Sequence, residues 1–209
     1  MDLTGDGIPE HVRRMRDRVV VYQGAREVWR SPEEWRVVDL ALGDPNDDGR
    51  NELMLALWKP GLDGLEPPGD WDEGTPRSRP FIVGYRGGVY RALWGGSAVT
   101  NPIHEVELGD VDGDGVEELV VVEALGDGST ERLVSVWRWH GWGFSNVWRS
   151  QPGLYSDLRL GPDGAFHVAV ERVEQCCLEV VRELNQGAEL RDESWFAGSS
   201  AQKRLVFHD

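Results

Sequence analysis

Acidic side chains alternate along one short stretch of the sequence, with a spacing that suits metal binding. In the segment DVDGDGVEE at residues 110–118, three aspartates occupy alternate positions, a glycine follows, and a glutamate closes the set. A tight turn can direct these carboxylates inward, and Gly115 adopts the positive φ of such a turn without steric cost. Crowded carboxylates repel one another unless a hard cation lies among them, and Ca²⁺ accepts about six to eight oxygen ligands. The stretch therefore predicts a calcium-binding loop.

The same nine-residue pattern occurs three times, in segments named here loop 1 (2–10), loop 2 (44–52) and loop 3 (110–118). In each loop the first, third, fifth and ninth residues offer side-chain oxygens, and the seventh offers its backbone carbonyl. The expected ligands are Asp2, Thr4, Asp6, Ile8 and Glu10 in loop 1; Asp44, Asn46, Asp48, Arg50 and Glu52 in loop 2; and Asp110, Asp112, Asp114, Val116 and Glu118 in loop 3. Recurrence favours up to three Ca²⁺ sites over solvated acidic turns. Because Thr4 brings a hydroxyl where the other loops bring a carboxylate or an amide, loop 1 is expected to bind most weakly.

The residues that follow the loops exclude an EF-hand. That motif needs a glutamate at its twelfth position, between two helices, whereas the twelfth positions here are Arg13, Leu55 and Val121. The segments after loops 2 and 3 are apolar and rich in β-forming residues, which indicates strands. We therefore expect each loop to lead into a β-strand.

An acidic loop of the form D-x-[DNT]-x-D-G-x-x-E that leads directly into an apolar strand resembles the FG-GAP/VCBS repeat of calcium-binding β-propellers, such as those of integrin α-subunits. The resemblance extends, as repeats, across nearly the whole chain. It implies a β-propeller and calcium ligation. It does not specify a function, because that family serves adhesion, carbohydrate binding and enzyme scaffolding alike.

Strand patterns recur around the loops in units of four. First strands are expected at 35–42, 103–108 and 154–160, the last of which enters a shortened turn without the acids. Second strands are expected at 10–14, 52–58, 118–124 and 165–171, third strands at 19–23, 81–85, 133–138 and 178–183, and fourth strands at 26–30, 89–94, 144–149 and 188–195. Four strands per repeat are typical of a propeller blade. We therefore predict an all-β fold, a four-bladed β-propeller of four-stranded antiparallel blades, as a single domain over 1–209.

The two ends of the chain are expected to close this ring. Three blades would lie at 35–95, 103–150 and 154–196, and the fourth would combine 203–209 with 8–30. The N-terminal repeat lacks a first strand, and 203–208 has the pattern of a first strand without a successor, so their pairing would cover two exposed sheet edges. A monomer is favoured on this basis, and the alternative is an incomplete ring that completes itself as a dimer.

Composition narrows the partners and the cellular location. A formal net charge of −15 in 209 residues argues against nucleic acid, which requires a basic surface. No apolar run approaches the ~18 residues of a membrane span. The neighbours Cys176 and Cys177 would point to opposite faces of a strand, which excludes an ordinary disulfide framework and leaves their role open. Because loops of this type suit the millimolar calcium outside cells, we expect an extracytoplasmic protein whose export signal preceded this sequence.

Two further groups of residues are candidate ligand sites. The long irregular segment 59–79 is expected on the face opposite the acidic loops, and its Trp71, flanked by Asp70 and Asp72, could stack on a sugar or dock a partner. A flexible acidic insertion is the favoured alternative for this segment. Trp139 and Trp142 could form an aromatic platform, although a hairpin held by cross-strand aromatic pairs is the favoured explanation. No catalytic motif is recognisable. The sequence thus favours a module that binds a protein or a glycan, and the alternative is an enzyme acting on polysaccharide or cell-wall material at the face carrying 59–79.

Overall fold

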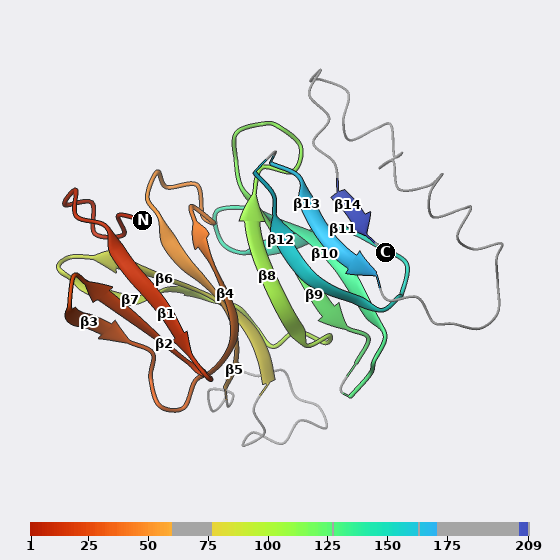
Figure 1. Ribbon diagram of the computed structural model, residues 1–209, viewed down its shortest axis with the longest axis horizontal. Coiled ribbons are helices and arrows are strands. Elements are labelled where there is room, and N and C mark those ends of the chain that lie inside the picture. Colours follow the sequence, from red (N-terminus) through yellow and green to blue (C-terminus); the bar gives the residue numbers. More distant parts are fainter. Residues whose placement is uncertain (60–76, 127, 163, 171–204, 209) are drawn as a thin grey trace.

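The computed structural model describes residues 1–59, 77–126, 128–162, 164–170 and 205–208. Within these ranges the secondary-structure elements are all β-strands. The strands form four sheets that lie side by side along the molecule (Figure 1). The predicted all-β fold is therefore confirmed. No helix in this described part of the chain is long and apolar enough to cross a membrane.

The sheets are numbered here in chain order. Sheet 1 contains β1 (Glu10–Met15), β2 (Arg18–Gln23) and β3 (Arg26–Arg30), and sheet 2 contains β4 (Arg36–Gly43), β5 (Glu52–Lys59), β6 (Arg77–Arg86) and β7 (Val89–Gly95). Sheet 3 contains β8 (Ile103–Gly109), β9 (Glu118–Ala124), β10 (Arg132–Trp139) and β11 (Phe144–Arg149), and sheet 4 contains β12 (Tyr155–Leu160), β13 (Phe166–Val170) and β14 (Leu205–His208). In sheets 1 to 3, consecutive strands pair antiparallel.

The strand predictions agree with the structure to within a few residues wherever the structure describes the chain. The strands expected at 178–183 and 188–195 lie outside the described residues. The expected closure of the ring is wrong: β14 pairs parallel with β13, from Phe166 opposite Leu205 onward, and not with the N-terminal sheet. The outer edge of β13 presents unpaired backbone groups that accept a strand in either direction, and this edge takes β14.

The hydrophobic core lies between successive sheets. On β5, Leu53 and Leu55 pack toward sheet 1 with Val21, whereas Met54 packs toward sheet 3 with Val121. Alternate residues of a strand point to opposite faces, and β5 has both faces covered. Its residues are therefore apolar almost without interruption and are buried along nearly the whole strand. Strand β9 is buried along its full length for the same reason.

Acidic side chains on the first strands of sheets 2 and 3 link each sheet to the next. Asp39 on β4 accepts a hydrogen bond from the Val106 N–H on β8 at 3.0 Å, and Glu105 on β8 accepts one from the Leu158 N–H on β12 at 2.6 Å. The register shifts by one residue next to Asp39 and again next to Glu105. Each acid stands five residues before the first aspartate position of its repeat, so the two contacts are equivalent. The same joint is thus repeated between sheets 2 and 3 and between sheets 3 and 4.

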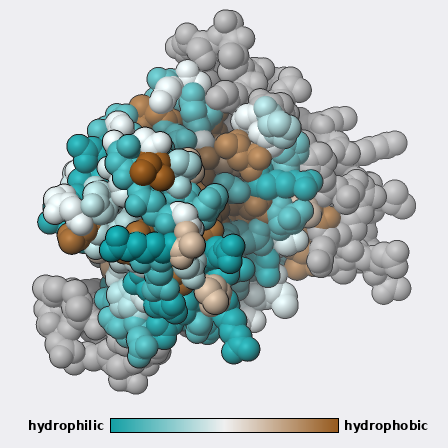
Figure 2. All heavy atoms as spheres, turned by 60° about the vertical axis from the view of Figure 1, so that its left-hand side comes forward, coloured by the Kyte–Doolittle hydropathy of each residue, from teal (hydrophilic) through white to brown (hydrophobic). Residues whose placement is uncertain are grey.

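The outer surface on the side of sheet 1 is mostly hydrophilic. Its hydrophobic side chains occur in small separate groups among polar ones (Figure 2). This distribution agrees with the burial of the apolar faces between the sheets.

Candidate metal centres

The three acidic loops occupy equivalent places in the fold. Loop 2 connects β4 to β5, loop 3 connects β8 to β9, and loop 1 leads into β1. The ninth residue of each loop is the first residue of the following strand and is almost fully buried, with Glu10 3%, Glu52 0% and Glu118 1% exposed. One carboxylate per loop is thus fixed at the edge of the core, while the others lie on a solvent-facing turn.

The backbone of each loop wraps around its first aspartate. In loop 3, Asp110 accepts hydrogen bonds from the N–H groups of Gly113 at 2.5 Å and Gly115 at 3.2 Å. Asp2 accepts the equivalent bonds in loop 1, from Gly5 and Gly7. In loop 2, Asp44 accepts bonds from the N–H groups of the fifth and sixth residues, Asp48 and Gly49. The sixth residue has positive φ in all three loops: 83° at Gly7, 82° at Gly49 and 92° at Gly115. This is the left-handed conformation predicted from the glycine pattern.

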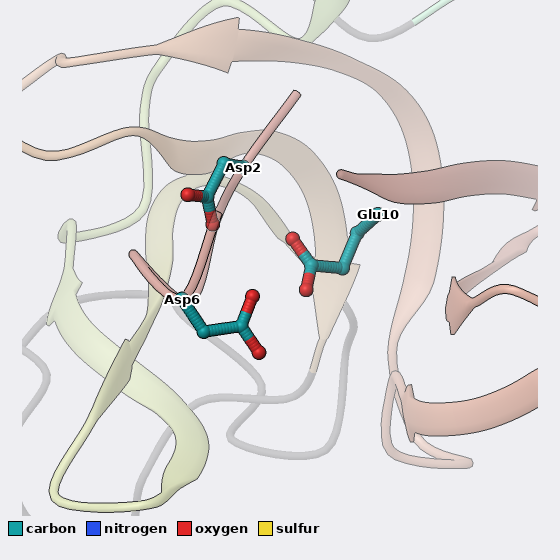
Figure 3. Close-up of side chains that lie close together, drawn as sticks. All are labelled: Asp2, Asp6 and Glu10. Atoms are coloured by element: carbon teal, nitrogen blue, oxygen red, sulfur yellow. The ribbon is translucent and has the colours of Figure 1, made fainter. Parts of the chain in front are cut away.

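The folded loops bring three carboxylates together in each case. One oxygen from each of Asp2, Asp6 and Glu10 lies within 4.8 Å of the other two, and their side chains point toward one another (Figure 3). The corresponding groups are Asp44, Asp48 and Glu52 in loop 2, and Asp110, Asp112 and Glu118 in loop 3. Oxygen donors at this spacing could hold a hard divalent cation.

The remaining predicted ligands have other contacts. Thr4 donates hydrogen bonds to Glu10 Oε1 at 3.2 Å and to Asp2 Oδ1 at 3.4 Å, so its hydroxyl lies among the loop 1 carboxylates. Asn46 Oδ1 accepts a hydrogen bond from the Asp48 N–H. Asp114 lies outside the close group of loop 3 and forms an ion pair at 3.8 Å with Arg138. The N–H groups of the seventh residues, Ile8, Arg50 and Val116, donate to the aspartates two positions earlier.

A proline makes the buried glutamate of loop 2 different from the other two. Glu10 Oε2 accepts a hydrogen bond from the Leu3 N–H at 2.7 Å, and Glu118 Oε2 accepts one from the Val111 N–H at 2.9 Å. The equivalent residue in loop 2 is Pro45, which has no N–H to donate. Accordingly, Glu52 Oε2 is buried without a hydrogen-bond partner.

Burial raises the pKa values of the buried glutamates of loops 2 and 3. Loss of solvent raises the pKa of Glu52 from 4.5 to about 7, and the hydrogen bond with Arg86 only partly opposes this effect. Loss of solvent also raises the pKa of Glu118, against the lowering effect of the Val111 N–H and Arg138. Exposed Asp6 shows the opposite direction, because the Ile8 N–H and then Gln23 stabilise its charged form and lower its pKa. Glu52 and Glu118, whose charged forms are disfavoured by burial, therefore gain from a nearby cation.

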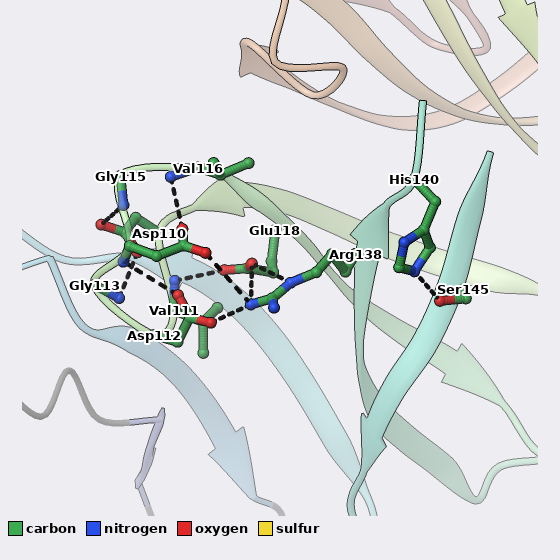
Figure 4. Close-up of polar contacts among 11 residues, drawn as sticks. Asp110, Val111, Asp112, Gly113, Gly115, Val116, Glu118, Arg138, His140 and Ser145 are labelled. Carbon is green, nitrogen blue, oxygen red and sulfur yellow. Dashed lines mark hydrogen bonds and ion pairs between the residues drawn. The ribbon is translucent and has the colours of Figure 1, made fainter. Parts of the chain in front are cut away.

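A donor side chain from the neighbouring strand reaches each acidic loop, and the sequence analysis did not identify it. Gln23 at the end of β2 donates to Asp6 Oδ2 at 2.9 Å and to Glu10 Oε1 at 3.3 Å. Arg86 at the end of β6 pairs with Asp48 and, at 2.5 Å, with Glu52. Arg138 on β10 contacts loop 3 in the same way (Figure 4). Only the strand register brings these residues to the loops, so no local pattern could have assigned them.

The donor set fits a hard cation better than it fits catalysis. Its atoms are carboxylate, amide and hydroxyl oxygens, without the nitrogen or sulfur ligands that zinc favours. The partnerless Oε2 of Glu52 adds an independent sign, because a buried carboxylate oxygen without a donor is costly unless a cation or a proton satisfies it. The residues present could therefore hold a hard divalent cation, most clearly in loop 2.

The other predicted ligand residues do not form a common site in the described structure. Asp70, Trp71 and Asp72 lie outside the described residues, as do Cys176 and Cys177. Trp139 packs edge-on against Trp94 at 5.6 Å between ring centroids, and it also contacts Phe144. Trp142 is 76% exposed, and its carbonyl accepts a hydrogen bond from Trp94 Nε1 at 2.9 Å. Trp139 thus joins sheets 2 and 3, whereas Trp142 presents its ring to solvent.

No protein-family model matches the chain, and no curated protein matches it.

Proposed function

We propose that this protein is a calcium-binding module whose metal ions are structural. The observation that carries the proposal is the partnerless, fully buried Oε2 of Glu52, which lies in a carboxylate group of the kind that recurs in three equivalent loops. A bound Ca²⁺ would satisfy that oxygen and relieve the repulsion between the carboxylates. It would also fasten the hairpin between two strands, because its ligands come from both the turn and the start of the following strand.

For the fold, we propose a four-bladed β-propeller of the FG-GAP/VCBS type in which β14 belongs to the last sheet and does not join the N-terminal one. Two features support it. Successive sheets pack face to face with their apolar clusters between them, and the same acid-to-backbone joint recurs from β4 to β8 and from β8 to β12. When each sheet is related to the next by the same rotation and contact, the sheets become the radially repeated blades of a propeller.

The biological role that follows is a binding or scaffold module outside the cytoplasm. Millimolar extracellular calcium would keep the loops filled, and a metal-stabilised array of sheets presents its connecting loops as a rigid surface for a protein or a glycan. The acidic composition agrees with a partner other than nucleic acid.

Thermal unfolding in calcium and in EGTA tests this proposal. A ligand that binds only the folded state stabilises it by about 2.7 kcal/mol per site at a hundredfold excess over Kd. For a chain of this length, each kcal/mol corresponds to about 2–4 °C in Tm. EGTA should therefore lower the Tm by about 5–11 °C for each occupied site, and added Mg²⁺ should restore less of the lost Tm than added Ca²⁺. Equal melting curves in calcium and in EGTA would refute structural calcium binding.

A further inference from the structure

The three loops differ in the charge of the side chain that reaches them from the neighbouring strand. Loop 1 receives the neutral amide of Gln23, whereas loops 2 and 3 receive the guanidinium groups of Arg86 and Arg138. All three donors bind the buried glutamate of their loop and lie close to its fifth residue. The donors of the three loops therefore occupy equivalent positions, but the donor of loop 1 is neutral and those of loops 2 and 3 are positively charged.

In loop 3 the guanidinium contacts the oxygens that a metal ion would need. Nη2 of Arg138 lies 2.9 Å from Glu118 Oε1, pairs with Asp112 Oδ2, and is 3.8 Å from Asp114 Oδ2 (Figure 4). Asp112 and Glu118 are two of the three carboxylates in the close group of this loop. The arginine side chain is 29% exposed, so it has solvent into which it can withdraw.

Loop 2 repeats this arrangement with Arg86. The guanidinium pairs with Asp48 Oδ2 and, at 2.5 Å, with Glu52 Oε1. It leaves the second oxygen of Glu52 without a partner. Arg86 therefore offsets part of the negative charge of the loop without satisfying all of its buried acceptors, and a metal ion would still gain from binding there.

We propose that Arg86 and Arg138 are internal counter-cations of loops 2 and 3, which a divalent cation must displace, while loop 1 binds the cation without such competition. This inference rests on the proposed calcium binding and adds the order in which the loops fill. A guanidinium and a Ca²⁺ repel each other strongly at contact distances in a partly buried site. Loop 1 therefore fills at the lowest calcium concentration. Ligand type alone, with Thr4 in loop 1, predicts the opposite order.

The arginines also give the loops a second role in the absence of metal. Each loop contains at least three carboxylates, and a guanidinium among them holds the hairpin together by charge-assisted hydrogen bonds. Loops 2 and 3 thus keep their shape at low calcium, whereas loop 1 depends on the ion.

Calcium titration of the full chain followed by NMR tests the proposal loop by loop. The backbone N–H groups of Gly7, Gly49 and Gly115 each donate to the first aspartate of their own loop, so each amide signal reports on one site. In the unmodified protein, the Gly7 signal should respond at the lowest calcium concentration. Arg138→Gln should lower the calcium midpoint of Gly115 at least about tenfold, and Arg86→Gln should do the same for Gly49.

A matched control and a reverse variant complete the design. Arg30 forms an exposed pair with Glu27 on β3, so Arg30→Gln removes the same charge without touching a loop and should leave all three midpoints unchanged. Gln23→Arg should weaken the Gly7 response at least about tenfold. In EGTA, Arg138→Gln should melt at a lower temperature than Arg30→Gln.

The outcomes separate the two proposals. If no glycine signal of the unmodified protein responds to calcium, the proposed function fails. If the signals respond but Arg86→Gln and Arg138→Gln have the same midpoints as Arg30→Gln, calcium binding stands and the counter-cation proposal is overturned. Weaker calcium binding in the two arginine variants would overturn it as well, because the guanidinium would then organise the site and not compete for it.

Discussion

Replacing Pro45 with valine would give loop 2 the backbone N–H that loop 3 has at Val111. In loop 3 this group donates to Glu118 Oε2 at 2.9 Å, and in loop 2 the equivalent oxygen of Glu52 has no partner. A hydrogen bond to a charged acceptor contributes about 1.5–3 kcal/mol. Loss of the rigid proline in the unfolded chain offsets about 0.4–1 kcal/mol of this gain. The metal-free variant should therefore be more stable by about 1–2 kcal/mol.

The pH dependence of this gain follows from the pKa of Glu52. Burial raises that pKa from 4.5 to about 7, so the folded state holds the proton more tightly than the unfolded chain does. Ionising the buried carboxyl then removes about 3 kcal/mol of stability as the pH rises from 4.5 to about 7, and no more above that range. Because the new N–H stabilises the ionised form, Pro45→Val should show its full advantage above pH 7 and little at pH 4.5.

Urea unfolding in EGTA, at pH 5 and at pH 8, measures both effects. Thermal unfolding should show a Tm increase of about 2–8 °C at pH 8. Pro162→Val is the control. Pro162 is exposed in the turn after β12, and no equivalent glutamate is present there to accept a hydrogen bond from the new N–H. If Pro45→Val is no more stable than Pro162→Val at pH 8, the missing N–H does not destabilise the ionised form of Glu52.

Three further perturbations test other parts of the structure by chemical denaturation. Burial and then Arg132 lower the pKa of His104, so stability should fall as the pH drops below about 6.5, and His104→Gln should remove that slope. Asp47 has a φ of 54° at a loop position where loops 1 and 3 have glycine; Asp47→Gly should change stability by less than about 1 kcal/mol, whereas Asp47→Val should cost about 1–2 kcal/mol, and equal effects would contradict the backbone argument. Glu105→Ala should cost about 1–3 kcal/mol by leaving the Leu158 N–H unpaired, and Glu105→Gln should recover most of it; a glutamine as harmful as alanine would point to the lost charge instead.

Local features of the sequence predicted the strands and loops well. The acidic spacing located the hairpins, and the glycines at the sixth positions have the expected positive φ. The apolar run from Leu53 to Leu57 indicated a strand, and its lack of alternation reflects burial on both faces. These features depend on residues that are close in sequence, so the sequence alone was enough to predict them.

Features that depend on distant residues could not be predicted. The pairing of β14 with β13 is a choice between sheet edges, and the residues of β14 do not encode which edge they meet. The contacts of Arg138 with loop 3 require the register between β9 and β10. The missing hydrogen bond at Glu52 Oε2 could be recognised only in the structure, where the N–H groups of Leu3 and Val111 donate to the glutamates of loops 1 and 3 and Pro45 has no N–H to donate.

The joints between sheets have a consequence for how such a chain could change over time. Asp39 and Glu105 both bind a main-chain amide of the next sheet, so the fit does not depend on which residue carries that amide. The donating residues are in fact different, Val106 in one joint and Leu158 in the other. A unit built in this way can be copied, lost or exchanged without a matching substitution in its neighbour, and its outer loops remain free to diverge.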